Sequence, residues 1–335
     1  MRYAAFLNLK PSEATDSQDK NFLTHLNNHG IFLPDFEDAG PVILPVLSAL
    51  AEQVRQDLYT PNEWAQGFKR FAVNSREANK EDDNHAIFDA FDNLTWSNKS
   101  GPWGMLEKKD SSWNLAPLTN GQLVPGAPDR SWGSRLECLR PELRNAEKLK
   151  YFIMPNDARN FILPNFICHL KGTIYNTQVL KAQALYDGAL AARAMHALRL
   201  YVYGPEAWDN DAHAIASTYA DSQLVMYTVR PRRASPVART QYFMHIIDGM
   251  YLEAREQNFK RGVSMWRNLG DWAFKERNNL IEAANKVYEQ TRKDTSPALD
   301  DFHAESLDHI KYYCVKNQNR WEFDDTGEVV KAKGK

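Results

Sequence analysis

The chain has 335 residues, of which 43% are apolar and 25% charged, and its 41 basic and 43 acidic side chains give a net charge of −2. This composition excludes a wholly disordered chain. The near-zero charge excludes a global positive field, so any binding to nucleic acid needs a local patch.

The sequence pattern predicts neither a membrane-spanning helix nor a signal peptide. No apolar run reaches the roughly 18 residues of a membrane-spanning helix, and Met1–Asn8 meets a polar residue too early for a signal peptide. Cys138, Cys168 and Cys314 are too scattered for a disulfide framework or a zinc knuckle. We expect a cytoplasmic or nuclear protein without a membrane partner, although unconventional secretion stays open.

The first hundred residues are typical of helices. We expect a short helix over Asn21–Asn28 and a longer one from about Leu44, where apolar residues recur at helical spacing. The polar stretch Ser75–Asn84 predicts a loop, and His85–Leu94 predicts another short helix.

One helix start in this region has a specific signature. In Thr60-Pro61-Asn62-Glu63, the threonine is a suitable N-cap, the proline fits the first helical position, and Glu63 completes a capping box. The helix should bury Trp64, Phe68 and Phe71 and end near Asn74.

Extended segments begin after Trp103. A hairpin is expected around Asn120-Gly121, between the short runs Trp113–Leu118 and Gln122–Pro125. Residues 136–150 predict a charged helix, and Asn160–Lys171 is the most strand-like stretch of the chain.

The remaining elements alternate between helix and strand. They are a helix over Thr177–Leu200, a hairpin of Ala214–Tyr219 and Leu224–Val229 around Asp221-Ser222, a strand over Tyr242–Ile247, helices over 254–291 with breaks at Gly262 and Gly270, a helix over Ala298–Val315, and a basic tail, Lys331–Lys335. This order predicts an α/β fold with one mixed sheet. We divide it into an N-terminal helical region (1–100) packing on a core (101–292), and a C-terminal helix with the tail (293–335).

Four residues form a pattern typical of metal-dependent phosphodiesterases. His169 and Lys171 share one face of a strand because side chains alternate. Asp129 can end on a neighbouring strand, and Gln183 lies about two turns into the next helix. Carboxylates hold Mg²⁺ beside a phosphate, while a lysine stabilises the attacking water or the developing charge. Three of them also have an ordinary explanation: Asp129 as a turn cap, His169 as a hydrogen-bonded core histidine, and Lys171 as a lysine reaching solvent.

Several segments resemble a family of fungal proteins assigned to the PD-(D/E)XK nuclease superfamily. The matching stretches are Asn114–Gly121, Val124–Arg130, Leu163–Gly172, Gln183–His196, Ser217–Tyr219, Leu224–Thr228 and Phe259–Ala284. They follow one another in order along a segment, from Asn114 to about Ala284, that spans about half the chain. The resemblance implies a PD-(D/E)XK nuclease-like core of a helix, strands, a helix and another strand around a mixed sheet. It makes Asp129 the motif aspartate, Lys171 the motif lysine and Gln183 the helix glutamine.

Two departures fall in the implied site. His169 stands where the motif has Glu or Asp, and 172–176 replace a Gly-Pro-Asp-Gly-type loop. Imidazole is a poor ligand for Mg²⁺ and suits Mn²⁺ or Zn²⁺ better. The departures favour a catalytically degenerate nuclease. The alternative is an altered Mg²⁺ or Mn²⁺ site at Asp129 and His169, with Glu52 as an extra ligand.

One basic cluster follows the second hairpin. Arg230, Arg232, Arg233 and Arg239 lie within ten residues, interrupted by prolines. We expect a loop in which these arginines hold phosphates, or else a solvated loop without a ligand.

Three functions therefore remain open. The first is a degenerate nuclease-like protein that binds nucleic acid or a protein partner. The second is an active metal-dependent phosphodiesterase that cuts nucleic acid. The third is a fungal effector or interaction module without a nucleic-acid role.

Overall fold

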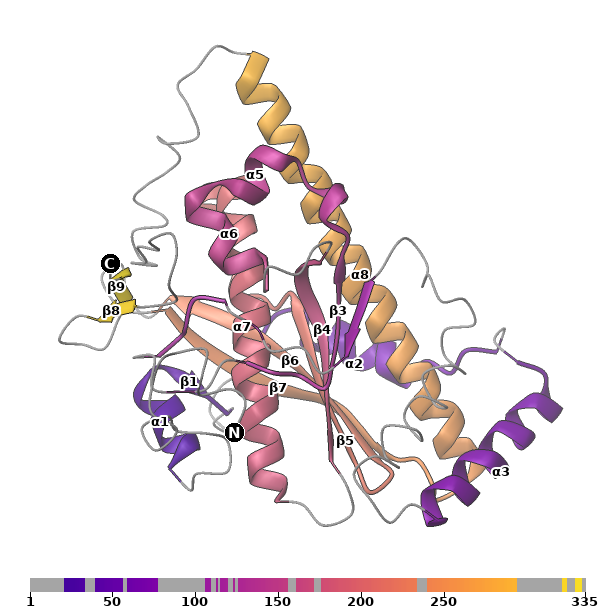
Figure 1. Ribbon diagram of the computed structural model, residues 1–335. Coiled ribbons are helices and arrows are strands. Elements are labelled where there is room, and N and C mark those ends of the chain that lie inside the picture. Colours follow the sequence, from indigo (N-terminus) through magenta and orange to yellow (C-terminus); the bar gives the residue numbers. More distant parts are fainter. Residues whose placement is uncertain are drawn as a thin grey trace.

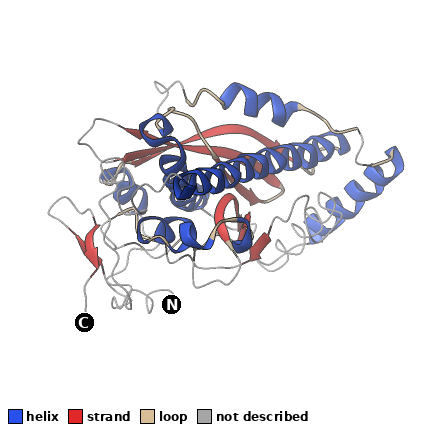
Figure 2. Ribbon diagram, turned by 90° about the horizontal axis from the view of Figure 1, so that it is seen from above, coloured by secondary structure: helices blue, strands red, loops and turns tan. Residues whose placement is uncertain are grey.

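The computed structural model describes residues 21–33, 40–56, 59–77, 106–109, 113, 115–119, 123, 126–155, 161–171, 176–233, 240–293, 321–323 and 329–332. Helices flank a seven-stranded sheet in this part of the chain (Figure 1, Figure 2).

The strands are β1 (Ile31–Phe32), β2 (Leu106–Lys109), β3 (Arg130–Ser134), β4 (Ile162–Lys171), β5 (Ala214–Ala220), β6 (Gln223–Arg233) and β7 (Thr240–Tyr251). The helices are α1 (Phe22–Asn28), α2 (Leu44–Glu52), α3 (Pro61–Glu77), α5 (Pro141–Asn145), α6 (Glu147–Ile153), α7 (Thr177–Tyr203) and α8 (Glu256–Lys293), with 3₁₀ turns η1 (Leu136–Cys138) and η2 (Gly204–Ala207). A separate hairpin pairs β8 (Trp321–Phe323) with β9 (Val329–Ala332).

The sheet is mixed, which confirms the α/β class. Its order is β1-β7-β6-β5-β4-β3-β2, and β2, β3 and β4 pair antiparallel. Helix α7 then carries the chain over the sheet so that β5 pairs parallel to β4, because parallel neighbours need a long crossover. Strands β5, β6 and β7 complete the sheet antiparallel, and β1 adds a parallel edge.

Alternation along β4 divides the core into two layers. Phe166, Cys168 and Leu170 pack with α2, α3 and α8. Ile167 faces the opposite layer, where the alanines of α7 lie close against β5 and β6. His169 has the same parity as Ile167 and therefore faces α7.

The predicted capping box of α3 is confirmed. The Thr60 N–H donates to Glu63 Oε2 at 2.7 Å, and the Glu63 N–H donates to Thr60 Oγ1 at 3.3 Å. The helix buries Trp64 and Phe71 against Phe259 of α8. It continues to Glu77, so the loop expected from Ser75 begins later than predicted.

The strand and helix predictions between 160 and 251 are also confirmed, but two others were wrong. The helix over 136–150 is broken into η1, α5 and α6, because Pro141 begins a new helix and Ala146 has extended backbone angles. Helix α8 runs without a break through Gly262 and Gly270. A Cβ on Gly262 would lie 2.1 Å from Leu252 Cδ2, so this glycine permits close packing beside the end of β7.

Several expected elements lie wholly or largely outside the described residues. They are the helices His85–Leu94 and Ala298–Val315, most of the hairpin around Asn120-Gly121, and the end of the basic tail. In the part of the chain that the structure describes, no helix is long and apolar enough to cross a membrane.

Candidate functional site

The candidate site lies where β3, β4 and α7 meet. Strand pairing sets Arg130 opposite Cys168, which brings Asp129, the residue before β3, beside His169 near the end of β4. Helix α7 crosses this face of the sheet and contributes Asp187. Three ionisable side chains from three elements are thus brought together.

His169 lies between two carboxylates. Its ring is 2% exposed, with Nδ1 3.7 Å from Asp129 Oδ2 and Nε2 3.1 Å from Asp187 Oδ2. The second approach is an ion-pair contact rather than a well-aligned hydrogen bond. Asp129 Oδ2 also accepts the Leu170 N–H at 2.7 Å, so this carboxylate is fixed by the backbone of β4 as well.

Asp187 was missed by sequence reasoning. Its helix is rich in small residues, a composition that by itself indicates close packing on the sheet. In the structure, Asp187 Oδ2 accepts the Ala127 N–H at 3.1 Å, and a Cβ on Gly126 would lie 2.4 Å from Asp187 Oδ1. Glycine therefore lets the loop before β3 close over the acid. The sequence does contain a signal for Asp187: it is an acidic residue one helical turn after Gln183, within a run of alanines.

Burial controls the protonation of Asp187. It raises the pKa of this carboxyl above its ordinary value, and the opposing effects of His169 and the Ala127 N–H do not cancel the rise. A charged Asp187 thus depends on the neighbouring imidazole.

Lys171 and Gln183 flank this group. Lys171 lies two residues after His169 on the same strand face, and Gln183 lies one turn before Asp187 on α7. Both are partly exposed. The structure thus places the predicted lysine and glutamine on the two elements that carry His169 and Asp187.

Glu52 does not belong to this site, and its prediction as a metal ligand was wrong. It is exposed at the end of α2. Leu47 and Ala51 of that helix pack in the layer that contains Cys168 and Leu170. Glu52 is therefore on the opposite face of the sheet from His169.

The residues present do not fit a divalent metal. A histidine ligand must direct a ring nitrogen lone pair at the ion, whereas both ring nitrogens of His169 face carboxylates. Among the described residues, no group of three or more His, Cys, Asp or Glu side chains is arranged to hold a metal ion.

The predicted arginine loop is also wrong. Strand β6 continues to Arg233 because β7 pairs with it over this whole stretch. Alternation then directs Arg230 and Arg232 to one face and Arg233 to the other. Arg239 lies outside the described residues.

Each described arginine has neighbours within the protein. Arg230 is buried and donates to Asn210 Oδ1 and to His245 Nε2. Arg232 is exposed, lies 4.5 Å over the Phe243 ring and donates to Gln241. Arg233 lies 5.9 Å from the Trp208 ring. Of these three, only Arg232 presents its side chain mainly to solvent.

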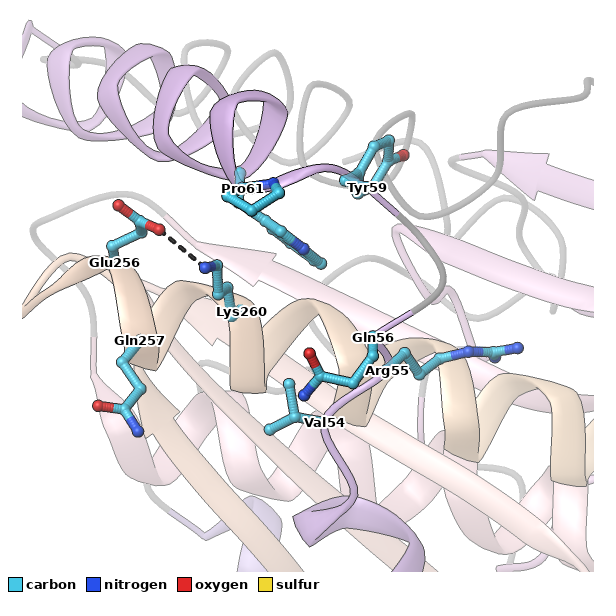
Figure 3. A pocket seen from close by; sticks show the side chains of 9 residues that line it. Val54, Arg55, Gln56, Tyr59, Pro61, Glu256, Gln257 and Lys260 are labelled. Atoms are coloured by element: carbon cyan, nitrogen blue, oxygen red, sulfur yellow. Dashed lines mark ion pairs between the residues drawn. The ribbon is translucent and has the colours of Figure 1, made fainter.

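A cavity of about 590 Å³ lies between α8 and the segment that joins α2 to α3 (Figure 3). It is lined by Val54, Arg55, Gln56, Tyr59, Pro61, Trp64, Glu256, Gln257 and Lys260. Lys260 pairs with Glu256 at 2.9 Å, and Arg55 pairs with Asp271. Both cations of the lining are thus neutralised by the protein, and the cavity borders the layer opposite His169.

In comparisons with known proteins, no family model, no curated protein and no solved structure matches this chain.

Proposed function

We propose that this chain is a nuclease-like protein that has lost metal-dependent catalysis and acts by binding a nucleic acid or a protein partner. The order of elements supports a nuclease-like core. Three antiparallel strands, a crossover helix and a parallel strand follow one another as β2, β3, β4, α7 and β5. These elements agree with the strands, helix and further strand that the resemblance to the PD-(D/E)XK family implies after its first helix.

The positions of the motif residues agree with that order. Asp129 immediately precedes the second of these strands, and His169 and Lys171 end the third. Gln183 lies on the crossover helix.

The loss of catalysis rests on one observation, the position of the His169 ring between Asp129 and Asp187. In this position the imidazole occupies the space between the two carboxylates, 3.1 Å from Asp187 and 3.7 Å from Asp129, where a shared metal ion would have to sit. Without an ion, neither the activation of water nor the neutralisation of a phosphorane is provided.

The test combines metal binding with cleavage. Mn²⁺ and Mg²⁺ are titrated by calorimetry into the wild type, Asp129→Ala and the control Glu282→Ala, which removes an exposed carboxylate on α8. The same proteins are incubated with labelled single- and double-stranded DNA and RNA. We expect no specific heat and no cleavage from any of them. Metal-dependent cleavage by the wild type and the control that Asp129→Ala lacks would establish the active phosphodiesterase instead.

The kind of partner is tested separately by fluorescence anisotropy with labelled DNA and RNA at low and high salt. Nucleic-acid binding through phosphates weakens steeply as salt rises, and Arg232→Ala should weaken it further. An absence of salt-dependent binding would leave a protein partner, as in the interaction-module hypothesis.

A further inference from the structure

A short connector, Trp208–His213, joins η2 to β5 and contacts four other elements. Trp208 packs on His196 of α7 with ring centroids 4.2 Å apart, and Asp209 pairs with Arg199 of the same helix. Asn210 accepts from Arg230 of β6, and Asp211 Oδ1 accepts the Ile43 N–H at 2.9 Å just before α2. The connector therefore ties together helices that cover opposite faces of the sheet.

Its last residue, His213, makes the link to α8. The ring is 8% exposed, with Nε2 3.2 Å from Asp209 Oδ2 and Nδ1 3.2 Å from Glu276 Oε2. Neutral imidazole has one N–H donor, whereas the imidazolium ion has two. Only the protonated ring can donate to both carboxylates at once.

We propose that His213 is a pH-sensitive clamp, which fixes α8 to the connector while its ring carries a proton and releases this contact when the proton is lost. Nothing in this proposal depends on the metal chemistry or on the proposed binding function.

The charges around His213 come from three elements. Asp209 belongs to the connector, Glu276 to α8, and Arg199 and His196 to α7. Burial alone would lower the pKa of His213, but the hydrogen bonds to the two carboxylates outweigh burial and the repulsion by Arg199, so this pKa lies above its ordinary value.

His196 does not compete for the proton. Burial lowers its pKa to about 3, and His213 and Arg199 add to that effect. It is therefore neutral wherever His213 titrates.

The direction of the pH effect follows. Because the folded-state pKa of His213 is raised, the stabilising link is complete below the ordinary histidine pKa of about 6.5 and is lost as the pH rises through the folded-state pKa. The connector and the middle of α8 should then open more often on the alkaline side.

Two measurements test the clamp on the full chain, with His213→Gln, Glu276→Gln and the control Glu282→Gln. The midpoint of the His213 ring titration, followed by NMR, should lie above about 6.5 in the wild type and fall in Glu276→Gln. Hydrogen exchange, corrected for the intrinsic rate, should show lower protection of the connector and of 273–280 on the alkaline side. The loss of protection should approach about tenfold per unit of pKa shift.

The variants give a clear contrast. Glu282→Gln should keep the wild-type pH dependence, while His213→Gln and Glu276→Gln should show low protection at every pH. The proposal would be overturned by wild-type protection that does not change with pH, or by a Glu276→Gln profile identical to the wild type. Thermal unfolding confirms that each variant is folded.

Discussion

His169 and His213 are both placed between two carboxylates, but in different surroundings. Each ring lies between two carboxylates, at 3.7 and 3.1 Å for His169 and at 3.2 Å on both sides for His213. The side chain of Asp187 beside His169 is 3% exposed, whereas those of Asp209 and Glu276 beside His213 are 33% and 32% exposed.

The difference in solvent access decides whether burial or pairing with histidine controls the pKa of each carboxyl group. At Asp187 desolvation outweighs the pairing with His169, and the carboxyl pKa is raised. At Asp209 burial also acts to raise the pKa, but the bonds to His213 and the charge of Arg199 outweigh it, and the pKa is lowered. A histidine between two carboxylates is thus part of the buried core at His169, whereas at His213 its carboxylate partners stay in contact with solvent.

The largest effect should come from removing the buried ring. His169→Ala leaves Asp187 buried without the imidazole that pairs with it, and we expect a loss of about 3–5 kcal/mol in the free energy of unfolding at neutral pH. His213→Ala should lose only about 1 kcal/mol, because its partners keep contact with water. Urea unfolding of both variants, with the wild type alongside, measures this contrast.

The pH dependence of His169→Ala sharpens the same test. Since the pKa of Asp187 is raised, its carboxyl takes up a proton readily as the pH falls, and the buried charge disappears. The destabilisation should therefore shrink in acid. Equal losses for the two alanine variants, or a loss at His169 that does not vary with pH, would contradict the assigned role of burial.

An intermediate effect is expected at His196, the neutral neighbour of His213. Its pKa of about 3 in the folded state lies below the ordinary value, so folding becomes less favourable as the pH falls below about 6.5. Between about pH 7 and pH 5 this costs about 2 kcal/mol, which His196→Leu should remove. Denaturant unfolding of the wild type and the variant at both pH values checks it, and identical pH profiles would show that His196 is not the acid-sensitive group.

Much of the fold could be predicted because its signals are local. The apolar run of β4, the capping box at Thr60 and the Asp221-Ser222 hairpin each depend on a few neighbouring residues. The turn residues Asp221 and Ser222 both have positive φ angles, 47° and 59°, as a tight two-residue hairpin loop requires. Strand alternation likewise predicted that His169 and Lys171 share a face.

The errors concern contacts between distant segments. Glu52 was placed at the site because helical periodicity does not reveal which face of a sheet a helix covers. Arg230 was placed in a loop because Pro231 interrupts the local strand pattern, whereas pairing with β7 continues the strand through it. Asp187 was missed because its partner is supplied by the crossing of α7 over β4.

The smallest effect should come from Asp129→Asn. The amide oxygen can still accept the Leu170 N–H, now bonded at 2.7 Å, and only the 3.7 Å ion pair with His169 is lost. We expect a change below about 1 kcal/mol in the free energy of unfolding. Asp129→Ala removes the acceptor too and should cost about 1–3 kcal/mol more, because the Leu170 N–H loses its partner. If urea unfolding gave equal losses for the two variants, the charge of Asp129 rather than its hydrogen bond would hold the loop to β4, and His169 would depend on both of its carboxylates instead of chiefly on Asp187.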